Sequence, residues 1–223
     1  MADHQSNTEF EGGWIADEGW AVLAIAGIAT ILLTLISLPI GTFALGLMAW
    51  LRYTLRAPSR LSPDDPGLVL APADGVIIEV TENIDEAASE REMIGASRVT
   101  IRTGLADAQL QRSPVAGRII DNFLIPGLFR GGEELGLMRR DNERREISLE
   151  TADGARFLLA QIGTATARQL VCRFGPGKFL AAGAPLGMAR IGGLTDIVIP
   201  FGYKLEIKVG RTVVAGETIL ARR

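Results

Sequence analysis

The chain has 223 residues, enough for one domain of ordinary size with an appendage. Its formal net charge of −3 argues against nucleic-acid binding, which needs clustered Lys and Arg to neutralise phosphates. Cys172 is the only cysteine, so an intramolecular disulfide is excluded. His4 is the only histidine and lies in the N-terminal tail, so the rest of the chain lacks the commonest general base and zinc ligand. We therefore expect no metal site.

The stretch from Trp20 to Leu51 contains no charged residue and exceeds the roughly 20 apolar residues of one membrane span. Pro39 interrupts it, because proline cannot continue a helix without losing a hydrogen bond. We expect two short helices, Trp20–Ser37 and Ile40–Leu51, forming a hairpin that dips into or crosses the bilayer. A buried helical hairpin of a soluble protein is the alternative. The preceding residues 1–19 form a polar, acidic tail without Lys or Arg, unlike a signal peptide.

Three arginines, Arg52, Arg56 and Arg60, follow the apolar stretch. By the positive-inside rule they predict a protein of the cell inner membrane whose following domain faces the cytoplasm. Prolines then make residues 52–66 a stiff linker, and the domain is expected to cover residues 67–223.

Beyond this linker, short β-rich runs alternate with Gly, Pro, Asp and Asn, which predicts a mainly β domain. The expected strands are Leu68–Ala71, Gly75–Val80, Ser97–Thr103, Gly117–Phe123, Glu146–Thr151, Arg156–Ile162, Gln169–Arg173, Met188–Ile191, Asp196–Pro200 and Lys204–Val209. Gly131–Asn142 is left open between a short helix and a mobile loop.

A weak internal repeat relates the segment from Gly177 to the segment from Gly210. In each, a glycine and a basic residue precede an apolar pair, then Ala-Gly, then another apolar position. The unit resembles the half-motif of biotinyl- and lipoyl-type domains. This resemblance implies a barrel-sandwich or hammerhead-like β domain, and the chain lacks the Met-Lys-Met tip that would carry an attached cofactor.

Leu186–Pro200 reads as two strand-like apolar runs broken by Gly192 and Gly193. Paired glycines in a strand pattern indicate a tight bend or a close approach of backbone or ligand. Earlier in the chain, Ala71-Pro-Ala-Asp74-Gly75 reads as a turn with an acceptor at its bend.

Six segments follow one another in a distinctive order: the helical hairpin, the Ala71–Gly75 turn, Arg112-Ser-Pro-Val-Ala-Gly, Asp141-Asn-Glu-Arg-Arg, Ala167-Arg-Gln-Leu-Val-Cys and the glycine turn. In this order they resemble the phosphatidylserine decarboxylase family, in its short membrane-anchored form. The resemblance implies conversion of phosphatidylserine to phosphatidylethanolamine. It also implies a proenzyme that cuts its own chain before a serine, which becomes a pyruvoyl group. An Asp-His-Ser set drives that cut.

The family's aspartate is present as Asp74, but its histidine falls at Gln109 and its cleavage serine at Gly193. A further departure is Leu124-Ile-Pro-Gly, where the family commonly has His-Pro-Gly. Glycine has no hydroxyl with which to attack a carbonyl, and no serine occurs after Ser148. We therefore expect no pyruvoyl cofactor.

Three hypotheses follow. The residues favour a membrane-bound homologue that keeps the fold and a headgroup pocket but has lost self-processing. The second is an active decarboxylase using Thr195 or an unrecognised route, and the third is a membrane-anchored scaffold without lipid specificity.

In the favoured hypothesis Asp74, Gln109 and the turn Gly192–Thr195 line the pocket. Arg112 and Arg168 are candidates for contacts to a carboxylate or phosphate of a phosphatidylserine headgroup, because guanidinium groups suit both. Structural ion pairs are the alternative role for each. The expected partners are membrane phospholipid and either a homo-oligomer or an active paralogue.

Overall fold

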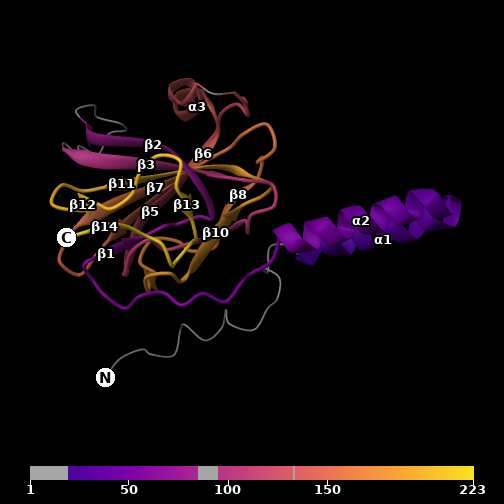
Figure 1. Ribbon diagram of the computed structural model, residues 1–223, viewed down its shortest axis with the longest axis horizontal. Helices are drawn as coiled ribbons and strands as arrows, with labels where there is room; N and C mark the ends of the chain where they lie inside the picture. Colours follow the sequence, from indigo (N-terminus) through magenta and orange to yellow (C-terminus); the bar gives the residue numbers. More distant parts are fainter. Residues whose placement is uncertain (1–19, 85–94, 133) are drawn as a thin grey trace.

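The computed structural model describes residues 20–84, 95–132 and 134–223, so the predicted acidic tail 1–19 lies outside the described residues. Figure 1 shows a helical hairpin that projects from one side of a β domain. As predicted, the protein is mainly β. Its largest sheet has eight strands and curls into an open half-barrel, and two three-stranded sheets accompany it.

The hairpin consists of α1 (Trp20–Ile36) and α2 (Leu38–Thr54). Two helices were predicted, but the second one begins before Pro39 and ends beyond the predicted Leu51. Pro39 lies in the first turn of α2, where its missing N–H would have no partner within the helix in any case. The proline therefore starts a helix here and leaves only Ser37 between the two.

Most large apolar side chains of the hairpin are exposed, with Leu35 at 79% and Phe43 at 78%. In the described part of the chain, the base of the hairpin packs against the β domain, where Leu23 and Leu55, the residue after α2, form one buried cluster with Leu110 and Met188. Among the residues that the structure describes, no helix is both long and apolar enough to cross a membrane.

Besides its strands, the part of the β domain that the structure describes contains one short helix. The strand predicted over Arg156–Ile162 is observed with the same bounds. Gly131–Asn142, for which a short helix and a loop were both considered, contains a short helix. The elements are β1 (Leu68–Leu70), β2 (Gly75–Ile84), β3 (Ala96–Thr103), β4 (Leu110–Arg112), β5 (Gly117–Ile125), α3 (Leu135–Asp141), β6 (Arg144–Glu150), β7 (Arg156–Ile162), β8 (Leu170–Cys172), β9 (Phe179–Leu180), β10 (Pro185–Ala189), β11 (Gly193–Ile199), β12 (Lys204–Leu205), β13 (Thr212–Val213) and β14 (Ile219–Arg222).

The strand order reveals two similar units, one nested in the other. The large sheet runs β13-β2-β3-β11-β7-β6-β5-β9, and the small sheets run β1-β14-β12 and β4-β10-β8. Each strand of β4–β10 therefore has a counterpart among β1–β3 and β11–β14. We call β4–β10 the inserted unit and β1–β3 with β11–β14 the split unit. The two units meet where β11 pairs with β7.

Backbone hydrogen bonds repeat between the units and include the predicted sequence repeat. The Gly210 N–H donates to the Ile77 carbonyl at 2.8 Å, and the Gly177 N–H donates to its counterpart Ile119 at 2.7 Å. Gly183 and Gly216, the second glycines of the repeat, share a left-handed φ of 74° and 76°. The repeat thus marks corresponding turns of the two units.

The main core lies on the inner face of the large sheet and is closed by the small sheets. It contains mainly β-branched and leucine side chains from both units, such as Ile77, Ile101, Ile119, Leu159 and Ile197. The central strands β7 and β11 are buried along nearly their whole length, whereas β2 and β5 begin with alternating buried and exposed residues.

Phe157 is the largest fully buried side chain and packs edge-on against Tyr203, with ring centroids 5.4 Å apart. We expect Phe157→Ala to lower the free energy of unfolding by about 3–5 kcal/mol, because the cavity cannot refill. Urea denaturation of the purified protein measures this. Phe179→Ala is the control, because Phe179 is half exposed, and a comparable loss there would contradict the assignment of the core.

Candidate functional site

Two segments carry the chain between the split unit and the inserted unit. Residues 104–109 lead from β3 to β4, and residues 190–192 lead from β10 to β11. The Gln109 side chain joins them. Its Oε1 accepts a hydrogen bond from the Gly192 N–H at 2.6 Å, and its Nε2 donates to the carbonyls of Gly104 and Asp107 at 3.0 and 2.7 Å.

The glycine turn, predicted as a tight bend or a close approach, carries the chain from one sheet to another. β10 already ends at Ala189 and belongs to a small sheet, whereas β11 starts at Gly193 in the large one. Ile191, Gly192 and Gly193 have successive φ values of 65°, 84° and 120°. Side chains rarely adopt such angles, so the two glycines relieve most of the strain of this crossing.

A cavity of about 480 Å³ opens beside this turn. Its walls come from both crossovers, the first residues of β11, the loop before α3 and the loop between β7 and β8. The lining residues include Gly192, Gly193, Thr103, Met138, Thr164 and Thr166. The hydroxyls of Thr164 and Thr166 lie 3.3 Å apart at its rim. Arg102, Asp107 and the apolar residues Val76, Leu105 and Leu194 also line the cavity, so its lining is largely apolar and includes one arginine, one aspartate and the threonines.

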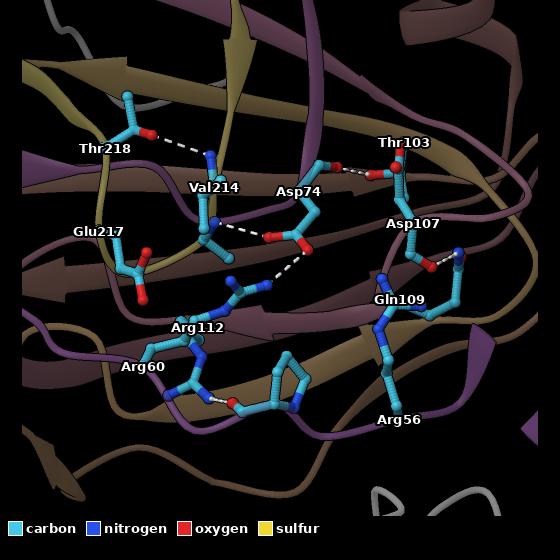
Figure 2. Close-up of polar contacts among 12 residues, drawn as sticks. Arg56, Arg60, Asp74, Thr103, Asp107, Gln109, Arg112, Val214, Glu217 and Thr218 are labelled. Atoms are coloured by element: carbon cyan, nitrogen blue, oxygen red, sulfur yellow. Dashed lines mark hydrogen bonds and ion pairs between the residues drawn. The ribbon is translucent and has the colours of Figure 1, made fainter. Parts of the chain in front are cut away.

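Asp74 is buried at the end of the β1–β2 turn, but its carboxylate does not meet Gln109. Oδ1 accepts from the Ala215 N–H at 2.7 Å, and Oδ2 accepts from Arg60 at 2.8 Å. Figure 2 shows this carboxylate directed toward Arg60, with Gln109 on the opposite side beside Asp107. Asp74 reaches the cavity only through its backbone carbonyl, which accepts from the Thr103 hydroxyl at 2.8 Å.

Arg112 is buried behind Asp74 and binds backbone. Its guanidinium donates to the Gly183 carbonyl at 2.8 Å and the Pro58 carbonyl at 2.6 Å. Burial, together with the positive charge of Arg60, lowers the pKa of the Arg112 guanidinium. Arg112 therefore fastens the linker to the domain and does not line the cavity. This favours a structural role for Arg112 over contact with a headgroup.

Arg168 lies close to the cavity, on the exposed loop between β7 and β8. Its Nε donates to the Ala165 carbonyl at 3.2 Å, and its guanidinium sits 5.8 Å from the centroid of the Phe129 ring. Ala165 lines the cavity, so Arg168 can reach an anion at the rim.

Thr195 lies two residues after Gly193, within β11. It pairs with Ile101 on one side and Gln161 on the other, and only 1% of it is exposed. Its hydroxyl accepts from Gln111 at 2.7 Å, and Gln111 in turn accepts from Gln161 at 2.7 Å. The hydroxyl points into the sandwich, on the other side of the sheet from Leu194.

Of the predicted site residues, Gly192 and Gly193 line the cavity, and Gln109 contacts it only through its hydrogen bond with Gly192. Asp74, Arg112 and Thr195 are not among the lining residues. Sequence reasoning missed Gln111 and Gln161, the threonines of the β7–β8 loop and the role of Arg60. Buried glutamines in apolar strands are a signal that could have been read, because such amides need partners. Within the ranges that the structure describes, no group of His, Cys, Asp and Glu could hold a metal ion.

Gln109 satisfies three backbone groups, so we expect Gln109→Leu to reduce stability by about 1–3 kcal/mol for each one left unpaired and buried. Urea denaturation measures the loss, and hydrogen exchange at residues 190–193 should rise. The control is Gln169→Leu, whose exposed amide accepts from Arg190. Equal losses in the two variants would contradict the role assigned to Gln109.

The chain was compared with known proteins. The family model of phosphatidylserine decarboxylase matches residues 47–221. The phosphatidylserine decarboxylase proenzyme of Ruegeria pomeroyi is 32% identical over 204 residues, covering 92% of this chain and 93% of the relative. The proenzyme of Geotalea uraniireducens is 33% identical over 207 residues, covering 92% and 95%. That of Mycolicibacterium gilvum is 37% identical over 166 residues, covering 74% and 71%. These matches span both units and the base of the hairpin, and the chain belongs to the phosphatidylserine decarboxylase family.

Proposed function

We propose that this family member binds the headgroup of phosphatidylserine at a membrane surface without cutting its own chain or forming a pyruvoyl group. The observation that carries the proposal is the hydrogen bond between the Gln109 side chain and Gly192, a lining residue of the cavity. Where the family resemblance calls for a base and a nucleophile, an amide accepts a backbone N–H and Gly193 offers no hydroxyl.

The chemistry of the cavity supports this proposal. Decarboxylation of an amino acid headgroup needs an electron sink, which the family makes from its serine. The hydroxyls at the cavity belong to Thr103, Thr164 and Thr166, and none of the chain's lysines, Lys178, Lys204 and Lys208, is among its lining residues. The threonine hydroxyls, Arg102 of the lining and the nearby Arg168 can orient a phosphate or carboxylate, whereas Asp107 is the one acidic residue of the described lining.

The hairpin supports membrane attachment. Its exposed isoleucine, leucine and phenylalanine side chains form an apolar surface that water disfavours and lipid accepts. The carbonyl of Thr54, the last residue of α2, accepts from the Gln109 N–H at 3.2 Å. The hairpin base therefore touches the crossover that lines the cavity, so a lipid headgroup beside the hairpin is within reach. We propose the inner membrane, with the β domain on its cytoplasmic side.

An active enzyme that uses Thr195 is the competing proposal. Its chain would have to be cut before Thr195, inside a strand that is paired on both sides, and the attacking hydroxyl already accepts from Gln111. Nucleophilic attack tolerates little misplacement, so this geometry favours the non-catalytic proposal.

We expect the purified protein to give a single mass near 23.9 kDa under denaturing, reducing conditions. The Ruegeria pomeroyi relative, purified in the same way, is the control and should give two chains, as its description as a proenzyme implies. Two fragments divided before Thr195 would establish the threonine route, and release of CO2 from phosphatidylserine vesicles would refute the non-catalytic proposal.

We expect detergent-solubilised protein to bind glycerophosphoserine more tightly than glycerophosphocholine in calorimetric titrations. Removing the rim guanidinium in Arg168→Ala should weaken glycerophosphoserine binding by about fivefold. Arg211→Ala, an exposed change beside β13, should leave it unchanged. Equal binding of the two headgroups by the wild-type protein would leave the scaffold hypothesis standing instead.

A further inference from the structure

One wall of the cavity is held in place from outside it, through α3. This helix lies in the connection between β5 and β6, at the edge of the domain in Figure 1, and is therefore part of the inserted unit. Met138 of α3 is 4% exposed and packs against Ile162 and Leu194, next to Gly193. The same side chain lines the cavity, together with Gly131 of the preceding loop.

The neighbouring Arg139 faces away from the cavity and crosses to the split unit. Its Nε donates to Asp196 on β11 at 2.6 Å, and its Nη2 donates to Thr100 on β3 at 2.6 Å. Nη2 also forms an ion pair with Glu79 on β2. The Thr100 hydroxyl in turn donates to Asp196 at 2.6 Å. One guanidinium thus ties α3 to three strands.

The contacts of Arg139 with Asp196 are largely shielded from solvent, which strengthens them. The Arg139 side chain is 18% exposed and that of Asp196 is 5% exposed. Burial alone would lower the pKa of the Arg139 guanidinium, but the charges and hydrogen bonds of Asp196 and Glu79 outweigh it and raise that pKa. The arginine therefore stays charged, and its fork shape lets it serve several acceptors at once.

The C-terminal end of α3 is tied within the inserted unit, because the Asp141 carbonyl accepts from the Leu128 N–H at 2.8 Å and the buried Asn142 side chain donates to the carbonyls of Arg130 and Gly163. The rest of the described helix has few contacts besides those of Arg139. The helix has seven residues, its N-terminal cap makes no side-chain hydrogen bond, and Met138 is its buried residue. Leu135 adds a partly buried apolar contact. Such a short helix is not stable by itself and depends on its tertiary contacts.

We propose that Arg139 is a positioning residue that holds α3, and with it the Met138 wall, over the cavity beside Gly193. Asp196 lies three residues after Gly193 on the same strand, so the anchor and the turn share one rigid support. That the positioned wall serves headgroup binding rests on the proposed function, whereas the anchoring itself does not.

The first measurement is hydrogen exchange of the full-length protein in detergent. In Arg139→Ala, amides of residues 135–141 should exchange about tenfold faster, while those of β7 stay unchanged. Arg140→Ala is the matched control, since the next side chain is 72% exposed and pairs with Asp141. Arg139→Lys keeps the charge but not the fork, and should fall between wild type and alanine. Unchanged exchange in both Arg139 variants would overturn the proposal.

The second measurement is calorimetric titration with glycerophosphoserine. Affinity should fall about tenfold in Arg139→Ala, partly recover in Arg139→Lys and stay within about twofold in Arg140→Ala. Faster exchange at α3 with wild-type affinity would overturn the claim that the positioned wall matters for binding. If wild-type protein shows no headgroup preference, the proposed function fails, and the exchange data still decide whether Arg139 anchors α3.

Discussion

The structure depends on how the chain crosses twice between two nested units. Each crossing leaves one sheet and enters another, so its backbone groups cannot all be paired within a ladder. Gly192 lies in the second crossing and has a left-handed φ. Its N–H donates a hydrogen bond to the side-chain oxygen of Gln109, which lies in the first crossing. One side chain thereby closes both crossings. The cavity lies beside this closure because neither sheet continues there.

The local sequence pattern predicted the elements whose secondary structure follows from their own residues and not from distant contacts. β7 is a nearly continuous apolar run of seven residues that is buried along almost its whole length at the centre of the sheet, so its bounds followed from the sequence. β10 and β11 were misplaced because their limits depend on which sheet each one joins. β4 is only Leu-Gln-Arg, too short and polar to be recognised. Pro39 was taken to interrupt a helix, although it lies in the first turn of one.

The candidate site was only partly readable. The family resemblance pointed to Gly193, which lines the cavity, and to Gln109, which bonds the neighbouring Gly192. Asp74, indicated in the same way, lies outside the cavity. Nothing local in the sequence indicates that Arg60 would neutralise Asp74, or that Arg139 would reach Asp196 on a distant strand. Such contacts join segments far apart in sequence, and their partners are chosen by the fold. Gln111 and Gln161 could be suspected as buried amides, but their pairing could not.

The nested arrangement has a consequence for chain connectivity. The inserted unit enters at Leu110 and leaves near Met188, and these two residues are register partners in adjacent strands. Its ends therefore meet, as the ends of an independent module would. A break in the second crossing would open only one of two links, since the peptide through residues 104–109 stays whole and β11 remains between β3 and β7. Even if this crossing were cut, the two units would stay joined by one covalent link and by the pairing of β11 with both β3 and β7.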